Sequence, residues 1–536
     1  MASEAPSQAL LESGDAASYG AADAGKKSTW GWPKFSSPFQ GWSLNAPLVA
    51  ECFGTACLVF TIGCLVTSPA PATWVPTGIA FLLMVMIYAT AAISGGNLNP
   101  AVSLALAICG KLPRATMLTY WMVQLVGGFI GSGLFRLVCS PNYVVVAPIK
   151  PFGAGSAFFA ELIYTAMLCF TVLSCAASKR NNPKSDPNQF YALAIGFVII
   201  AGGHAVGGIS GAALNPAVAL GLGSTSGKEV GWPWLWATAE LLGAAIAAGI
   251  FRVLRREEFA EDATEESLEK HEAGLATRCA AEFLGAFVLT LTVGLNLVAK
   301  SPATAFSAAA ALTCMIYSLG NISGAHLNPA VTMAVALRGK CTALDATCYS
   351  FSQLFGGVMA GICYAIFHMC SGSATKSIHL AVGKHYQLWQ ASLAETLFTM
   401  ILAYVVLTVA TTDIPAEWKT KSNAYFGLAI GACVTVGGFA CGAISGGELN
   451  PAVALGIYTA NGMNPGNGGV GSCGPLFAFM FSELAGGMLA AGMFRLTHGA
   501  PAAEGGETKD VEAPPGQEPA KAAAPAAAPA TEEFEA

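Results

Sequence analysis

The sequence predicts an all-α polytopic membrane protein with two tandem six-span units, each an inverted repeat with two half-membrane helices. Three observations lead to this prediction. The chain has 536 residues, of which 54% are hydrophobic and 11% charged, and its mean hydropathy is +0.56. This composition is too apolar for a soluble protein of this length. A nine-residue motif recurs four times, and a glutamate-bearing motif recurs four times upstream of it.

The apolar stretches are long enough to cross a bilayer. A hydrocarbon core of about 30 Å takes about 20 helical residues at ~1.5 Å per residue. Clear examples are residues 48–66, 77–93, 158–173, 281–298, 397–409 with their flanks, and 476–494. The sequence therefore predicts twelve spans in total.

The nine-residue motif interrupts these stretches with strong helix breakers. It reads SGGNLNPAV from Ser94, SGAALNPAV from Ser210, SGAHLNPAV from Ser323 and SGGELNPAV from Ser445. A short apolar run, about half a bilayer of helix, follows each proline. Asparagine is a preferred N-cap and proline fits the first helical turn, so each Asn-Pro pair predicts a helix start. The backbone before it must line a protein-enclosed cavity, because lipid cannot satisfy its polar groups.

The second motif places a glutamate upstream of each Asn-Pro-Ala. The copies are VAECFGTACLVF, FAELIYTAMLCF, AAEFLGAFVLTL and LAETLFTMILAY, with Glu51, Glu161, Glu282 and Glu395. The spacing from glutamate to asparagine alternates between shorter and longer, so the true period is two quarters of the chain. Three spans per quarter make consecutive quarters insert in opposite orientations. The two half-helices of one half then meet near the midplane with their positive N-terminal ends.

These repeats divide the chain into five segments. Residues 46–252 and 278–496 are the two six-span units. Residues 253–277 are a charged linker, for which we expect a solvated cytoplasmic hinge. Residues 1–45 are polar without a cleavable signal peptide, and residues 497–536, rich in Ala, Pro and Glu, are expected to be disordered.

Basic residues predict the orientation, because cytoplasmic loops carry an excess of Lys and Arg. The basic loop residues are Lys111, Arg114, Lys179, Arg180, Lys184, Lys419 and Lys421. With these loops in the cytoplasm, both termini and the linker are cytoplasmic too. Most of the sixteen cysteines lie in apolar spans and are expected to be packing residues, so we expect no metal site and no cofactor.

The paired Asn-Pro-Ala boxes and Ala-Glu starts resemble the major intrinsic proteins, the family of aquaporins and glycerol facilitators. The resemblance covers about residues 46–250 and 278–496 and implies two aquaporin-like units fused in tandem. The pore midplanes it implies are Asn99, Pro100, Ala101, Asn215, Pro216 and Ala217 in the first unit, and Asn328, Pro329, Ala330, Asn450, Pro451 and Ala452 in the second. The four glutamates resemble the family glutamates that hold re-entrant backbone.

The chain departs from the family at the outer filter. Most members carry arginine after the second motif, where this chain has Val218 and Val453. The same substitution, and the local sequence NPAVALG, resemble some plant vacuolar (tonoplast-type) aquaporins, which as a group also pass ammonia or urea. Family spacing implies a filter of Ile79, Gly203, Ala212 and Val218 in the first unit and of Ala308, Gly438, Gly447 and Val453 in the second. Such small, apolar rings predict wide pores.

Three more side chains are candidates for the pore walls. His204 and Phe439 follow the filter glycines, and each either packs between helices or turns into the lumen. Glu448 lies at the expected outer mouth of the second pore, where the first has Ala213. It is either a solvated group or a negative site where the family carries positive charge. His326 matches the usual family residue and is expected to pack within its loop.

The resemblance implies a passive channel for water and small neutral solutes, with glycerol, urea and ammonia as candidates, in the plasma membrane or a vacuolar membrane. A secondary transporter stays open, because inverted repeats and broken helices also serve transporters. A non-conducting junctional or scaffolding protein also stays open. An enzyme is the weakest alternative, since no nucleophile, base and acid recur in both halves. The expected partners are lipid, water and small solutes, without nucleic acid, and a second copy that completes the family's four pores.

Overall fold

The computed structural model describes residues 45–371, 380–412, 425–463 and 473–499. Every regular element within these four ranges is a helix, as the sequence predicts. The helices belong to one compact unit that begins at Ala46. The predicted N-terminal segment up to residue 44, the tail from residue 500, and Lys419 and Lys421 lie outside the described residues.

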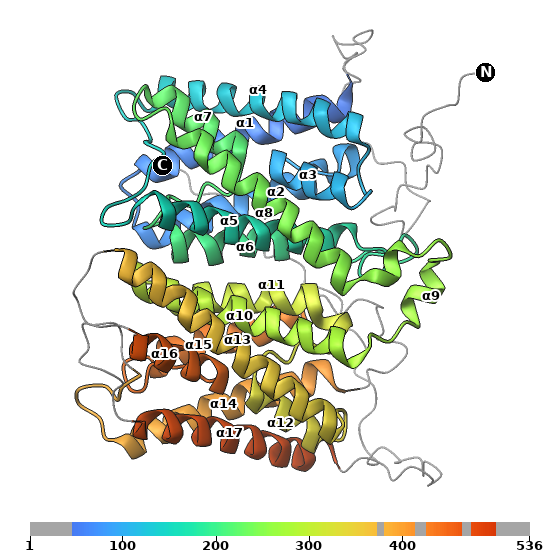
Figure 1. Cartoon of the computed structure of the whole chain (residues 1–536), viewed down its shortest axis with the longest axis vertical. Helices are drawn as coiled ribbons and strands as arrows, with labels where there is room; N and C mark the ends of the chain where they lie inside the picture. The colour runs from blue at the N-terminus through green and yellow to red at the C-terminus, as the bar shows by residue number, and fades with distance from the viewer. Residues whose placement is uncertain (1–44, 372–379, 413–424, 464–472, 500–536) are drawn as a thin grey trace, which may run out of the picture. The chain divides into compact units, whose positions relative to one another are not determined.

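The helices follow the predicted order in both halves (Figure 1). The first half consists of α1 (Ala46–Thr67), α2 (Val75–Ser94), α3 (Pro100–Ile108), α4 (Arg114–Val138), α5 (Ala154–Thr171), α6 (Tyr191–Val206), α7 (Pro216–Ser226) and α8 (Trp232–Leu254). The second half consists of α10 (Leu275–Ala299), α11 (Thr304–Ser323), α12 (Pro329–Leu337), α13 (Ala343–Cys370), α14 (Leu388–Ala410), α15 (Phe426–Cys441), α16 (Pro451–Met463) and α17 (Gly474–His498). Between them, α9 (Glu265–Glu269) lies in the linker.

The helix lengths separate full spans from half-helices. Ten of the described helices are long and apolar enough to cross a membrane, and the shorter apolar helices α6 and α15 bring the set to the predicted twelve. The half-helices α3 and α12 have nine residues each, α7 has eleven and α16 thirteen. At ~1.5 Å per residue, even the longest covers only about two thirds of the hydrocarbon core.

Glycines let the first full span of each half approach the third full span closely. In the first half, a Cβ on Gly127 or Gly131 of α4 would lie 2.3 or 2.2 Å from the carbonyl oxygens of Cys52 and Ala56 on α1. Any side chain there would push the two helices apart. Small residues at helix crossings are typical of membrane proteins. In lipid the hydrophobic effect does not drive helices together, so they associate through close van der Waals packing.

The two halves pack against each other through α5 and α6 of the first and α10 and α11 of the second. In Figure 1, α6 borders α11. The Tyr164 hydroxyl donates to Thr292 Oγ1 at 2.9 Å, and the Ser307 hydroxyl donates to the Ala201 carbonyl at 2.8 Å. These buried bonds join the halves within the membrane layer.

The linker differs from the expected solvated hinge, because its first turn is buried between the halves. Arg255 is fully buried, and its Nη2 donates to the Ser318 carbonyl at 2.9 Å and to Asn321 Oδ1 at 2.7 Å. Glu258 is only 5% exposed and accepts from Lys111 Nζ at 2.7 Å. Charged residues do not mark a solvated segment when they find partners, and here the partners are Lys111 in the loop after α3 and Ser318 and Asn321 on α11.

Candidate functional site

Each motif asparagine begins a half-helix, as the sequence predicts. The side-chain oxygen Oδ1 accepts from the backbone N–H two residues later, so it satisfies a donor that the helix itself leaves unpaired. These bonds are 2.8 Å from Ala101, 2.9 Å from Ala217, 2.8 Å from Ala330 and 2.9 Å from Ala452. Because the oxygen is fixed on the helix, the amide nitrogen must point away from it.

The amide nitrogens cross-link the two half-helices of each half. Asn99 Nδ2 donates to the Leu214 carbonyl and Asn215 Nδ2 donates to the Leu98 carbonyl, both at 2.9 Å. The equivalent bonds of the second half run from Asn328 to Leu449 at 2.8 Å and from Asn450 to Leu327 at 3.0 Å. An amide nitrogen carries two N–H groups, so each asparagine keeps one donor for the cavity that it lines.

The leucine before each motif asparagine adopts a left-handed backbone conformation. The φ angles are +52° at Leu98, +49° at Leu214, +53° at Leu327 and +53° at Leu449. This conformation costs a non-glycine residue about 1–2 kcal/mol. It turns the leucine carbonyl toward the opposite asparagine, so the strain is part of the cross-link.

The upstream glutamates hold these strained leucines in place. Each accepts the leucine N–H: Glu51 at 2.7 Å, Glu161 at 2.8 Å, Glu282 at 2.6 Å and Glu395 at 2.9 Å. All four glutamates are fully buried. Charge-assisted bonds to backbone N–H groups are among the stronger hydrogen bonds, which suits a group that must fix a re-entrant loop.

Two further glutamates bind the backbone of the motif, and sequence reasoning assigns no role to them. Glu240 of α8 accepts the Asn215 N–H at 2.9 Å, and Glu483 of α17 accepts the Asn450 N–H at 2.9 Å. The second oxygen of each, Oε2, has no hydrogen-bond partner among the described residues. The signal for this role was available: the two acids recur at matching positions of the last helix in each half.

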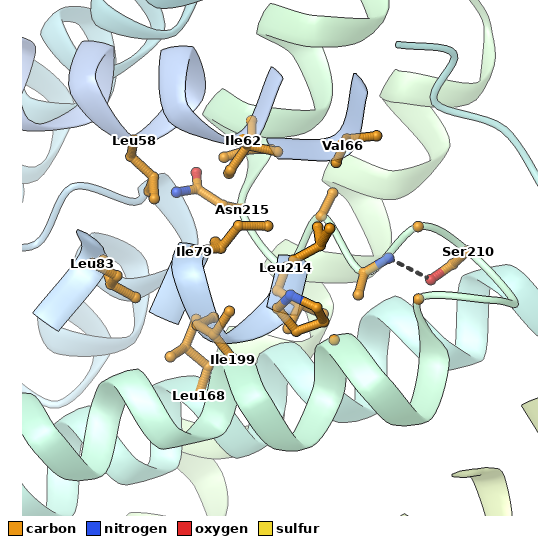
Figure 2. Close-up of a pocket in the computed structure, with 18 of the residues that line it drawn as sticks. Leu58, Ile62, Val66, Ile79, Leu83, Leu168, Ile199, Ser210, Leu214 and Asn215 are labelled. Atoms are coloured by element: carbon orange, nitrogen blue, oxygen red, sulfur yellow. Dashed lines mark hydrogen bonds between the residues drawn. The ribbon is translucent and has the colours of Figure 1, made fainter. Parts of the chain in front are cut away.

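The first half encloses a cavity of about 450 Å³. Figure 2 shows its wall, with Asn215 and Leu214 facing Leu58 and Ile62 of α1 and Ile79 of α2. The implied filter residues Ile79, Gly203, Ala212 and Val218 all line it, together with Asn99 and Asn215. The cavity therefore passes both the midplane asparagines and the positions that the family spacing assigns to the filter.

The second half encloses an equivalent cavity of about 390 Å³. Its lining includes the implied filter residues Ala308, Gly438, Gly447 and Val453, together with Asn328 and Asn450. Val218 and Val453 are 3% and 2% exposed, so they present only a small apolar edge to their cavities. The part played by these eight positions in selection stays a prediction.

The three residues proposed as further candidates for the pore walls all line a cavity, but they differ in exposure. His204 lines the first cavity, although it is only 6% exposed and packs between helices; its Nε2 has no partner among the described residues. Phe439 and Glu448 line the second cavity, and Phe439 is 59% exposed. His326 also touches the second cavity, but its Nδ1 lies 3.3 Å from Thr332 Oγ1 and its ring contacts Tyr349, which is the expected packing role.

Comparisons with known proteins agree with this arrangement. The family model of the major intrinsic proteins matches the chain over residues 39–221, 186–302 and 294–494. Nodulin-26 of Glycine max is 31% identical over 221 residues, which are 39% of this chain and 77% of nodulin-26. A probable aquaporin of PIP type (7a) from Pisum sativum is 31% identical over 187 residues, 33% of this chain, and the match spans 63% of that relative, a little under two thirds.

Among solved structures, the X-ray structure of the aquaglyceroporin from Plasmodium falciparum is similar at 22% identity with a TM-score of 0.34, covering 38% of this chain and 94% of that one. The family model spans both halves, and each half carries its own asparagine pair and cavity. The chain therefore belongs to the major intrinsic protein family of passive channels for water and small solutes, and it carries two of the family's units in tandem.

Proposed function

We propose that each half forms its own passive pore, so that one chain conducts water and small neutral solutes along two separate paths. The observation that carries this proposal is the pair of cross-linked asparagines in each half, each pair lining its own cavity. The free amide donors and the positive ends of the half-helices favour a water or hydroxyl oxygen and oppose cations.

We infer that both filters admit solutes the size of glycerol or urea. Valine offers no hydrogen-bond donor and far less bulk than a guanidinium with its five N–H groups. Gly203 and Ala212 in the first cavity, and Gly438 and Gly447 in the second, leave room beside the valines. A pore selective for water alone needs larger or more polar groups at these positions.

A channel fits the midplane better than a secondary transporter does. Alternating access requires one repeat to rock against the other. Here the hydrogen bonds between Asn99 and Leu214, and between Asn215 and Leu98, tie the two repeats of the first half together at their meeting point. Rocking would break both bonds in a buried setting, where unpaired polar groups are costly.

Stopped-flow light scattering on proteoliposomes tests the proposal. We expect rapid shrinkage against sucrose, and re-swelling against glycerol or urea, both linear in solute concentration and unaffected by a protonophore. Liposomes without protein are the control for bilayer leakage. Uptake that saturates at millimolar solute, or that a protonophore abolishes, would indicate a transporter, and no flux at all would indicate a scaffold.

We also infer that two copies associate to bring four pores together. The contact between the halves is heterologous: α5 and α6 of one unit meet α10 and α11, which are the first two helices of the other. The corresponding helices that take no part in this contact are α1 and α2 in the first half and α14 and α15 in the second. In the most apolar window of α11, 78% of residues are buried, against 28% in its counterpart α2. Two copies can close this pattern into a ring.

The proposed orientation places both termini and the linker in the cytoplasm, in a plasma or vacuolar membrane. Two basic groups of the first half's predicted cytoplasmic loops, Lys111 and Arg180, pair with the linker residues Glu258 and Glu257, and the backbone N–H of Lys179 donates to Glu258. This clustering supports a single cytoplasmic face under the positive-inside rule. Protease accessibility of the linker from one side of sealed vesicles tests the orientation.

A further inference from the structure

The mouths of the two cavities differ in charge. Among the described residues that line the first cavity, Lys300 is the one side chain with a full charge. Among those that line the second, the one acid is Glu448, and its carboxyl lies beside the buried carboxyl of Glu395. The first unit has Ala213 where the second has Glu448, so the first lacks the acid, and both units lack the arginine that family members carry after the second motif.

Lys300 reaches the first cavity from the other half of the chain. It follows α10 of the second half, and the segment Ala299–Pro302 lines the first cavity beside Gly207 and Gly208. A Cβ placed on Gly208 would lie 3.6 Å from the Ala299 Cβ, so the two segments run close to each other. A first unit standing alone would have no cation at this position.

Hydrogen bonds fix the segment that carries this lysine. Lys300 adopts the left-handed conformation (φ +54°), and Ser301 N donates to the Asn296 carbonyl at 2.9 Å. Asn296 Nδ2 donates to Ser307 Oγ at 2.8 Å, and Ser307 Oγ donates to the Ala201 carbonyl of α6 at 2.8 Å. Asn296 and Ser307 are fully buried. The segment is thereby anchored to α6 just before the filter glycine Gly203.

The carboxyl of Glu448 is placed against the wall of the second cavity. It folds back over Gly446, where a Cβ would lie 2.1 Å from Oε1, and the φ of +115° at Gly446 suits only glycine. The carboxyl also lies beside that of Glu395. Two buried carboxyls at one site share a proton, so Glu448 adds no second negative charge to this mouth.

We propose that Lys300 makes the outer mouth of the first pore electropositive, across the interface between the halves, whereas the second mouth has no such cation. The first mouth then repels small monovalent cations such as ammonium and protonated amines more strongly than the second does. Neutral solutes enter both pores. This inference rests on the proposed two-pore function, which it deepens by assigning a cation barrier to the first mouth alone.

Paired thiol reagents measure the charge of each mouth without relying on flux. The probes are aminoethyl and sulfonatoethyl methanethiosulfonate, which carry opposite charges at similar size. A212C places a thiol in the first cavity and A305C places one in the second, because both alanines line them. Mass spectrometry of the labelled peptide gives the rate of each reagent, so the native cysteines do not interfere.

We expect the cation-to-anion rate ratio to be lower at A212C than at A305C. A unit charge some 7 Å away in water changes the local concentration of a monovalent ion about threefold, so the ratio changes about tenfold. Lys300→Gln should raise the ratio at A212C by about this factor, and Lys300→Glu should raise it further. Glu448→Gln should leave the ratio at A305C nearly unchanged. High salt should shrink the two effects of the Lys300 variants.

Lys228→Gln is the matched control, because Lys228 is an exposed lysine that follows α7 of the first half and does not line the first cavity. It should leave both ratios unchanged. Equal ratios at the two positions, no response to Lys300→Gln, or an equal response to Lys228→Gln would overturn the inference. Water flux measured on the same preparations tests the two-pore function separately, so a charge difference without flux would contradict that function alone.

Discussion

At the scale of single residues, asparagine is required because it does two things at once. Its oxygen caps the half-helix, and its nitrogen binds the opposite half-helix while keeping one donor for the pore. Serine would cap without the second bond. The cap could be predicted from the sequence, because it depends on neighbours two residues away. The cross-link could not, because Asn215 finds Leu98 only once two distant half-helices meet.

Glu240 is the residue on which this account can be tested most simply. Glu240→Leu leaves the buried Asn215 N–H unpaired, and we expect a loss of about 1–3 kcal/mol of stability, seen as a lower melting temperature in detergent. Glu240→Gln is the control. This variant keeps an oxygen that can accept the Asn215 N–H. It also places an amide beside a glutamate, as in the first quarter of the chain, where Gln124 Nε2 donates to Glu51 at 2.8 Å. Equal destabilisation by the two variants would mean that the N–H bond is not what Glu240 supplies.

At the scale of elements, helix and half-helix positions follow from the sequence, while the state of the linker does not. Length, hydropathy and the Asn-Pro caps are local properties, so they fix α3, α7, α12 and α16 without knowledge of packing. The linker's charges suggested a hinge, because a sequence shows charge without showing partners. In the structure Glu258 meets Lys111 of the first half, and Arg255 beside it meets Ser318 of the second.

The linker contact should depend on pH. Burial alone raises the pKa of Glu258, but the hydrogen bonds from Lys111 and Ser178 and the charge of Arg255 outweigh it and hold the pKa below its ordinary value of 4.5. A lowered pKa in the folded state means that the contact stabilises the protein above pH 4.5 and is lost as the pH falls through the folded value. We expect the linker to resist an acid-tolerant protease at pH 5 and to be cleaved progressively faster below pH 4.5.

Lys111→Gln tests the cause of this pH dependence. Removing the ammonium takes away a main reason for the lowered pKa, so cleavage of the linker should begin at a higher pH than in the unaltered protein. Arg114→Gln, at the exposed first residue of α4 just after that loop, is the control and should leave the cleavage profile in place. A profile that is the same for both variants would place the pH response elsewhere.

At the scale of the whole molecule, duplication has produced two similar cavities with different surroundings. The repeats predict the two cavities, since each half holds a complete set of motifs. The repeats do not predict that Lys300, a residue of the second half, lines the cavity of the first half. Its position depends on how α6 packs against α10 and α11. A difference between the pores is therefore a property of the fused chain and not of either unit.

Restoring the family arginine should narrow each pore independently. Val218→Arg places a long, donor-rich side chain in the first cavity, and Val453→Arg does so in the second. We expect each variant to lose part of its glycerol flux while water flux falls less, because the guanidinium fills space that a larger solute needs. Val218→Leu, which adds bulk without hydrogen-bond donors, is the control. Unchanged glycerol flux in Val218→Arg would show that the filter lies elsewhere.

The central claim is that each half holds its own pore, and blocking one half at a time tests it most directly. Val218→Trp places an indole in the first cavity and Val453→Trp places one in the second. Water flux per folded protein is measured in proteoliposomes by stopped-flow light scattering for each variant and for the double variant. We predict that each single variant keeps part of the flux and that the double variant keeps none. Complete loss of flux in either single variant, with the protein folded and inserted, would contradict the claim.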